Sequence, residues 1–154
     1  AMNLRGTYED TGLVLRSDDN PNGYLARDLM KQILSRNKKQ KLPVMIPLTQ
    51  LELRVDRNSN HGLAFNLGED AQIVYAPILN KSGNFNSEDI DEKTGLPKKT
   101  EGGNRTLYIT NSGLSRLYLN RNLCLGSGID DLDGSTDGGR VVVVSDAEGI
   151  APKK

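Results

Sequence analysis

The sequence predicts an α+β fold in a single domain spanning residues 1–154, with strands near both ends of the chain and one or two helices. Three observations lead to this fold class: an amphipathic helical segment in the N-terminal third, several short segments with strand composition, and four consecutive valines near the C-terminus. A chain of 154 residues has the usual length of one domain and is large enough to bury a core.

The N-terminal part is expected to contain a strand and then a helix. Residues 12–17, Gly-Leu-Val-Leu-Arg-Ser, have the composition of a short strand, and a cluster of turn-forming residues follows them. Residues 24–36 then place Leu25, Leu29 and Ile33 on one face at helical spacing. We therefore expect an amphipathic helix that packs on the core.

The remainder of the chain alternates between strand-like segments and polar segments. Residues 51–55 and part of 73–79 alternate between apolar and polar side chains with the period of a strand. Residues 81–104 are polar and rich in turn formers, which predicts a polar surface insertion. Residues 105–110 restore a strand pattern, and residues 139–146, which hold the valines, are typical of a strand buried on both faces.

Composition argues against several classes of function. Lys and Arg number 20 and Asp and Glu number 20, so a nucleic-acid surface would need strong local clustering; the basic run at 36–41 is better explained as the end of a helix. Cys124 and His61 are the single residues of their types, which excludes disulfide frameworks and Cys/His zinc sites. A Cys124–His61 nucleophile pair stays formally open, but a lone Cys between leucines is typical of a packed residue. We expect no enzymatic activity, no cofactor and no nucleic-acid partner.

The N-terminus and the hydropathy profile bear on location. Ala1 ahead of Met2 is interpreted as a cloning remnant, and no signal peptide follows it. No apolar run approaches the length that spans a membrane, so we expect a soluble protein without membrane insertion.

Residues 112–139 have an unusual composition. Gly and Leu each occur six times there, and Ser and Asp four times each. The leucines, at positions 114, 117, 119, 123, 125 and 132, recur often enough to attach the segment to the core repeatedly, so the residues between them are expected to face outward. A long solvated loop with polar filler would also account for this composition.

A second feature favours another interpretation. Residues 102–147 contain no Lys, Glu, Gln or Met, and the whole chain lacks Trp. These are the amino acids whose codons all end in A or G. A segment in which the adenines of AAC or AAT codons were randomised would reach the other residue types but never these five or a stop codon. Leu, Gly, Arg and Val can be encoded without adenine and would be immune to the same process.

The stretch resembles the variable region of target proteins of diversity-generating retroelements, in which reverse transcription misreads template adenines and rewrites the C-terminal part of a ligand-binding protein. Its closing Gly-Arg-Val-Val-Val-Val-Ser, at residues 139–145, is most similar to the archaeal and archaeal-virus members. The resemblance covers roughly residues 105–146, of which 105–145 would be the variable region. It implies a C-type lectin-like fold, an antiparallel sheet with the N- and C-terminal strands paired. On this basis we expect Gly12–Leu15 to lie in the same sheet as Arg140–Val144.

The resemblance also implies a function. The chain would be a ligand-binding display protein, on a virion or outside the cell and in several copies, that binds a protein or glycan on a host or environmental surface. Tyr118, the large aromatic residue among the positions open to variation, would be the main contact. The candidate ligand-binding positions are Ser115, Tyr118, Asn120, Asn122, Cys124, Gly126, Gly128, Ile129, Asp130, Asp131, Asp133, Gly134, Thr136, Asp137 and Gly138.

The alternative function is that of a calcium-dependent carbohydrate-binding lectin domain, suggested by the aspartates at 130–137. Counted from Asp131 as an EF-type loop, Asp133, Ser135 and Asp137 fall at ligand positions. The sixth position, which should be Gly, is Thr136, and the twelfth, which should be Glu, is Val142. The Glu-Pro-Asn, Gln-Pro-Asp and Trp-Asn-Asp signatures of sugar-binding C-type lectins are also missing from the sequence. We therefore expect no metal site.

Overall fold

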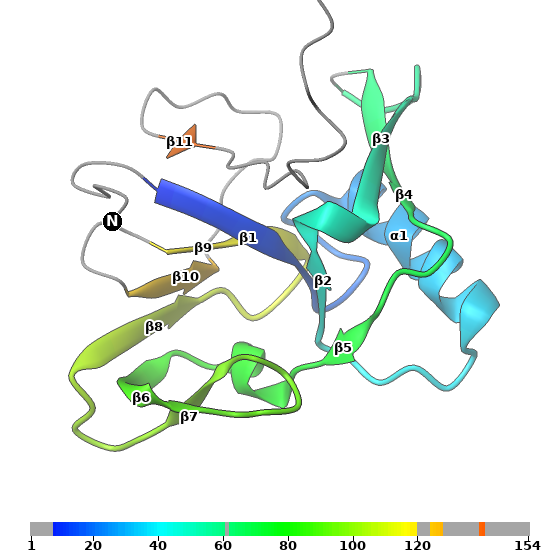
Figure 1. Ribbon diagram of the computed structural model, residues 1–154. Coiled ribbons are helices and arrows are strands. Elements are labelled where there is room, and N and C mark those ends of the chain that lie inside the picture. Colours follow the sequence, from blue (N-terminus) through cyan, green and yellow to red (C-terminus); the bar gives the residue numbers. More distant parts are fainter. Residues whose placement is uncertain (1–7, 61, 120–123, 128–138, 141–154) are drawn as a thin grey trace, which may run out of the picture.

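The structure is a computed structural model that describes residues 8–60, 62–119, 124–127 and 139–140. In this part of the chain the fold is mixed α+β, with most strands in one curled sheet and a single α-helix beside it (Figure 1). The predicted fold class is therefore confirmed at this level.

The large sheet has nine strands in the order β5-β2-β1-β9-β10-β8-β6-β7, with β11 also paired to β1. The bounds of these strands are Tyr8–Leu15 for β1, Val44–Pro47 for β2, Val74–Tyr75 for β5, Gly83–Ile90 for β6, Pro97–Lys99 for β7, Arg105–Ile109 for β8, Leu114–Leu119 for β9, Leu125–Ser127 for β10 and Gly139–Arg140 for β11. The remaining elements are α1 (Gly23–Arg36), a second sheet of β3 (Leu51–Val55) and β4 (Leu63–Leu67), and the short 3-10 helices η1 (Leu48–Gln50) and η2 (Pro77–Asn80).

The two described ends of the chain meet at β1. Tyr8 and Glu9 of β1 lie beside Gly139 and Arg140 of β11, so the expectation that the end segments share a sheet is met as far as Arg140. Val141–Val144 lie outside the described residues. The expectation of an antiparallel sheet is wrong in two places, because β1–β11 and β8–β10 pair in parallel.

The large sheet packs on a separate core on each face. The helix core holds Leu13 and Leu15 of β1 and Leu114 of β9 against Leu29 and Ile33 of α1. The helical spacing that predicts α1 thus also places its apolar face on the sheet. The second core consists of Val14, Ala76, Leu79, Phe85, Leu96, Leu107, Leu117 and Leu125. Alternate residues of β1 and β9 serve opposite cores, as expected for strands covered on both sides.

Residues 81–104, expected to form a polar surface insertion, are part of the sheet instead. They form the antiparallel pair β6–β7, and β6 is joined to β8 through Phe85 and Arg105. Phe85 and Leu96 are buried in the second core, at 5% and 4% exposure. The prediction fails because most side chains of β6 are exposed, so its sequence does not show the apolar alternation of a half-buried strand.

Candidate binding face of the sheet

Four in-register residues form a row across the part of the sheet that contains the predicted variable region. Asp10 of β1 lies beside Tyr118 of β9, Tyr118 beside Gly126 of β10, and Gly126 beside Tyr108 of β8. Neighbours in register point to the same face of a sheet. We call these residues the tyrosine row. Tyr108 is 54% exposed and Tyr118 is half-buried.

A cation and an anion flank Tyr118. The guanidinium carbon of Arg116 lies 4.5 Å from the centre of the Tyr118 ring, within the range of a cation–π contact. Arg116 Nη1 also lies 3.3 Å from Asp10 Oδ1, with both side chains mostly buried. These contacts restrict the ring of Tyr118, so the tyrosine row presents aromatic surface at a small cost in conformational entropy.

The ring of Tyr118 covers Gly126. A Cβ atom at Gly126 would lie 2.5 Å from Cζ and 2.8 Å from Oη of Tyr118, closer than such atoms approach in proteins. The ring therefore lies across the glycine, which is buried. Position 126 faces the same side of the sheet as Tyr118, but the ring covers it, so the prediction that it is exposed is wrong and a larger residue there would have to move the ring.

Ser115 is likewise buried, with no measurable exposure, although it is predicted to lie on the outer face. Its Oγ accepts a hydrogen bond of 2.8 Å from Nη1 of Arg16 and lies 2.8 Å from Oγ of Ser127. Arg16 Nη2 donates to Ser127 Oγ at 2.9 Å, and Arg16 Nε donates to the Leu79 carbonyl at 2.9 Å. The alternation of β9 explains the correction, because Ser115 shares a face with Leu117 of the second core.

The structure places few of the other candidate positions. Cys124 is half-buried, and its Sγ accepts a hydrogen bond of 3.5 Å from the backbone N–H of Thr106. The other candidates lie outside the described residues: Asn120, Asn122, Gly128, Ile129, Asp130, Asp131, Asp133, Gly134, Thr136, Asp137 and Gly138. His61 also lies outside them, so the structure does not report on a Cys124–His61 pair.

The prediction that the leucines of residues 112–139 attach this segment to the core is confirmed for the leucines that the structure describes. Leu114, Leu117 and Leu125 are buried, and Leu119 packs partly buried against the second core. Leu123 and Leu132 lie outside the described residues. Leu117, Leu119 and Leu125 thus lie on the face opposite the tyrosine row, whereas Leu114 shares the face of Tyr118 and packs in the helix core.

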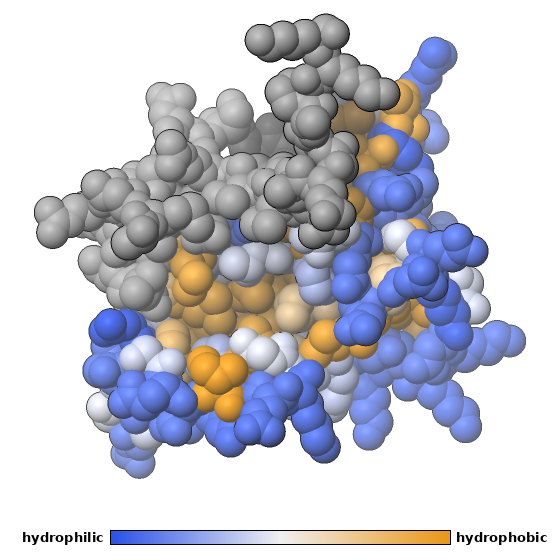
Figure 2. Space-filling model, in the orientation of Figure 1, coloured by the Kyte–Doolittle hydropathy of each residue, from blue (hydrophilic) through white to orange (hydrophobic). Residues whose placement is uncertain are grey.

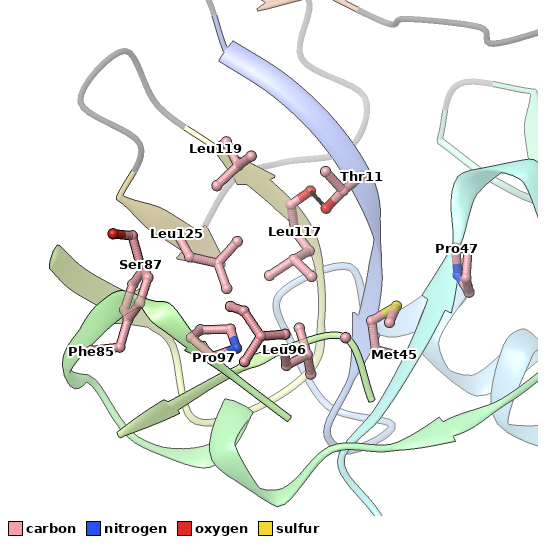
Figure 3. A pocket seen from close by; sticks show the side chains of 12 residues that line it. Thr11, Met45, Pro47, Phe85, Ser87, Leu96, Pro97, Leu117, Leu119 and Leu125 are labelled. Atoms are coloured by element: carbon pink, nitrogen blue, oxygen red, sulfur yellow. Dashed lines mark hydrogen bonds between the residues drawn. The ribbon is translucent and has the colours of Figure 1, made fainter. Parts of the chain in front are cut away.

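An apolar pocket that the sequence did not predict lies on the leucine side of the sheet. Its volume is about 410 Å³. Leu117, Leu119 and Leu125 point into it from the sheet, and Phe85 and Leu96 line it from β6 and the turn before β7 (Figure 3). Thr11 contributes a hydroxyl that donates to the Leu117 carbonyl at 3.1 Å. Apolar residues are visibly gathered at the centre of this side of the molecule in Figure 2. No charged side chain is among the residues that line the pocket within the described chain, so it suits neutral groups.

The described residues contain no group of three or more His, Cys, Asp or Glu side chains that could hold a metal ion. The aspartates at 130–137 are not among the described residues. Within the same ranges, no helix combines the length and apolar character needed to cross a membrane.

Comparison with known proteins identifies no relative of this chain. No protein-family model, curated protein or solved structure matches the chain.

Proposed function

We propose that this chain is a non-enzymatic ligand-binding protein, and that residues 105–145 are the variable region of a target protein of a diversity-generating retroelement. One observation carries the proposal: in β8, β9 and β10 the buried leucines of the second core, Leu107, Leu117 and Leu125, lie on the face opposite the tyrosine row. Such an arrangement separates residues that hold the second core from residues on the other face, where Tyr108 is 54% exposed and Tyr118 is half-buried.

The mixed α+β fold and the neighbouring β1 and β11 support a C-type lectin-like fold as part of this proposal. In that fold the N- and C-terminal strands pair and the variable residues share one face. The C-type lectin-like fold is tested together with the function. Both require that buried leucines hold the fold while the residues between them vary.

The ligand that fits the proposal is a protein or glycan on the surface of a host cell or in the environment. The exposed ring of Tyr108 and the ring of Tyr118 held by Arg116 provide aromatic area that suits either class. A protein of this kind is displayed on a virion or outside the cell.

The corrections at Ser115 and Gly126 narrow the variable set. Ser115 is tied to Arg16, and Gly126 is covered by Tyr118. We therefore assign both to the framework. Tyr118 remains a proposed variable position, as do the candidates that lie outside the described residues, among them Asn120, Asn122 and Asp131.

The testing experiment is a library randomised among small polar residues at Asn120, Asn122, Asp131, Asp133 and Thr136. Most members should melt within a few degrees of the parent, since exposed substitutions cost within about 0.5 kcal/mol each. A control library places the same residue types at Leu114, Leu117 and Leu125, and its members should fail to fold because those side chains are buried. Protease resistance on a display platform scores folding. If the first library fails as often as the control, its positions are structural and the proposal is wrong.

The nucleotide sequence of the locus provides an independent check. A near-copy of codons 105–145 that differs from them at adenines would identify the template of the retroelement. A locus without such a copy and without a reverse transcriptase gene would contradict the diversification, though not the binding function.

A further inference from the structure

The β3–β4 hairpin forms a sheet of its own next to α1, away from β8, β9 and β10 (Figure 1). Its register pairs Leu51 with Leu67, Leu53 with Phe65, and Val55 with Leu63. Within the described ranges, β3 has no strand neighbour other than β4. Among these residues, the outer edge of β3 is therefore not paired with another strand.

The hydrogen bonds at the two ends of the hairpin show which backbone groups face this edge. Asp56 N–H donates to the Gly62 carbonyl, and Gly68 N–H donates to the Gln50 carbonyl, each at 2.8 Å. Residues alternate between inward and outward bonding along an antiparallel strand. Leu51, Leu53 and Val55 are offset by one residue from Gln50 and Asp56, so their N–H and C=O groups point to the outer edge.

One face of this edge strand carries the apolar side chains Leu51, Leu53 and Val55, and two of them are largely exposed. Leu53 is 67% exposed and Val55 is 78% exposed, and Leu63, which pairs with Val55, is 38% exposed. Natural edge strands usually carry charges or proline that prevent pairing with other chains. β3 carries its charges, Glu52 and Arg54, on the other face, so the apolar face beside its outward backbone groups is a template for strand addition.

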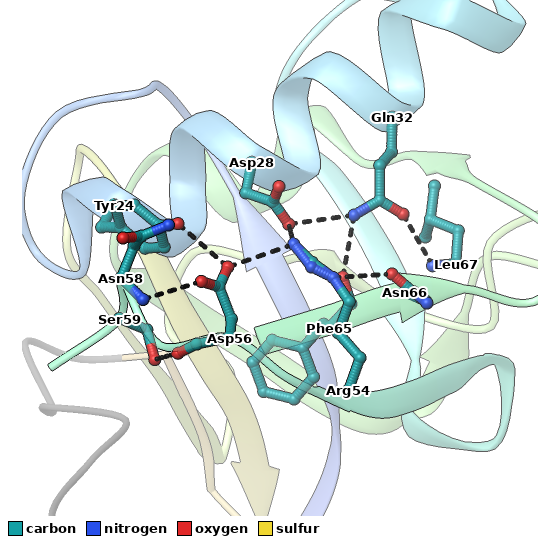
Figure 4. Close-up of polar contacts among 10 residues, drawn as sticks. All are labelled: Tyr24, Asp28, Gln32, Arg54, Asp56, Asn58, Ser59, Phe65, Asn66 and Leu67. Atoms are coloured by element: carbon teal, nitrogen blue, oxygen red, sulfur yellow. Dashed lines mark hydrogen bonds and ion pairs between the residues drawn. The ribbon is translucent and has the colours of Figure 1, made fainter. Parts of the chain in front are cut away.

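Polar contacts on the opposite side of the hairpin hold it to α1 (Figure 4). Arg54 Nη2 lies 2.7 Å from Asp28 Oδ2, and Arg54 Nε donates to Asn66 Oδ1 at 3.0 Å. Tyr24 Oη donates to Asp56 Oδ2 at 2.9 Å, and Gln32 Nε2 donates to the Phe65 carbonyl at 2.8 Å. The edge is thus fixed in place before a partner binds, which lowers the entropy cost of binding.

We propose that a second copy of this chain binds here, with the two β3 strands antiparallel about a two-fold axis at Leu53. In this arrangement Leu53 lies opposite the second copy's Leu53, and Leu51 lies opposite its Val55. Glu52 then lies opposite the second copy's Arg54, so unlike charges face each other on the side away from the apolar residues. The segment Leu-Glu-Leu-Arg-Val is complementary to itself in both hydrogen bonding and charge, which favours a second copy over an unrelated strand.

The interface would also join the apolar surfaces of both hairpins. Leu53, Val55 and Leu63 of each copy would form one apolar face of a four-stranded sheet. The proposal does not depend on the ligand of the tyrosine row, and neither outcome of its test alters the proposed function.

Cysteine cross-linking tests the register of this dimer. In a Cys124→Ser background, Leu53→Cys places two cysteines opposite each other with their Cα atoms about 5.5 Å apart, within disulfide range. The control Glu52→Cys places them on a diagonal about 7 to 8 Å apart, outside that range. Under mild oxidation Leu53→Cys should form a covalent dimer at least about tenfold faster than the control. Equal rates would reflect random collisions and overturn the proposal.

Sedimentation equilibrium tests the association itself. The unmodified chain should dimerise with increasing concentration, and Leu53→Lys should raise the dissociation constant at least about tenfold, because like charges then meet at the axis. The control Leu34→Lys replaces a leucine of α1 that is 37% exposed and should leave the dissociation constant unchanged. A chain that stays monomeric at all concentrations, or equal effects of both substitutions, would overturn the proposal.

Discussion

Arg16 is a buried cation whose partners among the described residues are all uncharged. It is 7% exposed and bonds to the hydroxyls of Ser115 and Ser127 and to the Leu79 carbonyl. Burial lowers the pKa of Arg16 to about 10, so the side chain remains charged at neutral pH. Because a buried charge is costly without hydrogen bonds, each of these acceptors is important to the fold.

Loss of one acceptor should therefore destabilise the protein. We expect Ser115→Ala to lower the free energy of unfolding by about 1.5 to 3 kcal/mol, the range for hydrogen bonds to charged groups. Ser87→Ala removes an exposed hydroxyl bonded to the neighbouring Glu88 and should change stability by less than about 0.5 kcal/mol. Urea unfolding of both variants measures the difference. Equal stabilities would show that Arg16 does not need this acceptor, and that position 115 can vary.

The sequence predicts individual elements well where their side chains alternate with a regular period. Residues 24–36 are helical, and residues 51–55 and 105–109 are strands, as expected. The sequence predicts the wrong environment for Ser115, which is buried and not on an exposed face. A small polar residue fits a buried network as well as an exposed face, and its distant partner Arg16 is not visible in the local pattern.

The β6–β7 pair shows how a polar segment can still belong to the framework. Phe85 extends from β6 into the second core and lines the apolar pocket. We expect Phe85→Ala to cost about 3 to 5 kcal/mol of stability, through lost burial and the cavity left behind.

The matched control for that substitution is Ile90→Ala. Ile90 lies on the same strand but is 42% exposed, so its truncation should cost much less. Thermal unfolding of both variants measures the difference. If Phe85→Ala is tolerated as well as the control, residues 81–104 form the surface insertion that their composition suggests.

Calcium distinguishes the two candidate functions at the scale of the whole molecule. If the aspartates at 130–137 belong to a variable face, millimolar calcium should leave the melting temperature unchanged, since only a ligand that binds the native state raises it. The reference sample contains a chelator in place of calcium. A rise of several degrees would favour the calcium-dependent lectin instead.

The sequence predicts only part of the strand pairing in the large sheet. The meeting of the two end segments follows from the resemblance, and the structure has β11 beside β1. The parallel direction of that pair and of β8–β10 could not be predicted, because strand direction depends on the route of the connections and not on composition. The apolar pocket was missed for a related reason: its lining comes from segments as distant as Thr11 and Leu125.

The position of β1 between β2 and β9 has a consequence for how the protein is made. The bond from the Thr11 hydroxyl to the Leu117 carbonyl joins residues 106 positions apart in the chain. During synthesis, β1 must therefore wait until most of the chain has left the ribosome before β9 can pair with it. Sheets closed by such distant pairings fold slowly, in about milliseconds to seconds. Completion of the sheet is thus a late event in translation, and a chain that ends before residue 114 retains β1 with β2 but without β9 and β11.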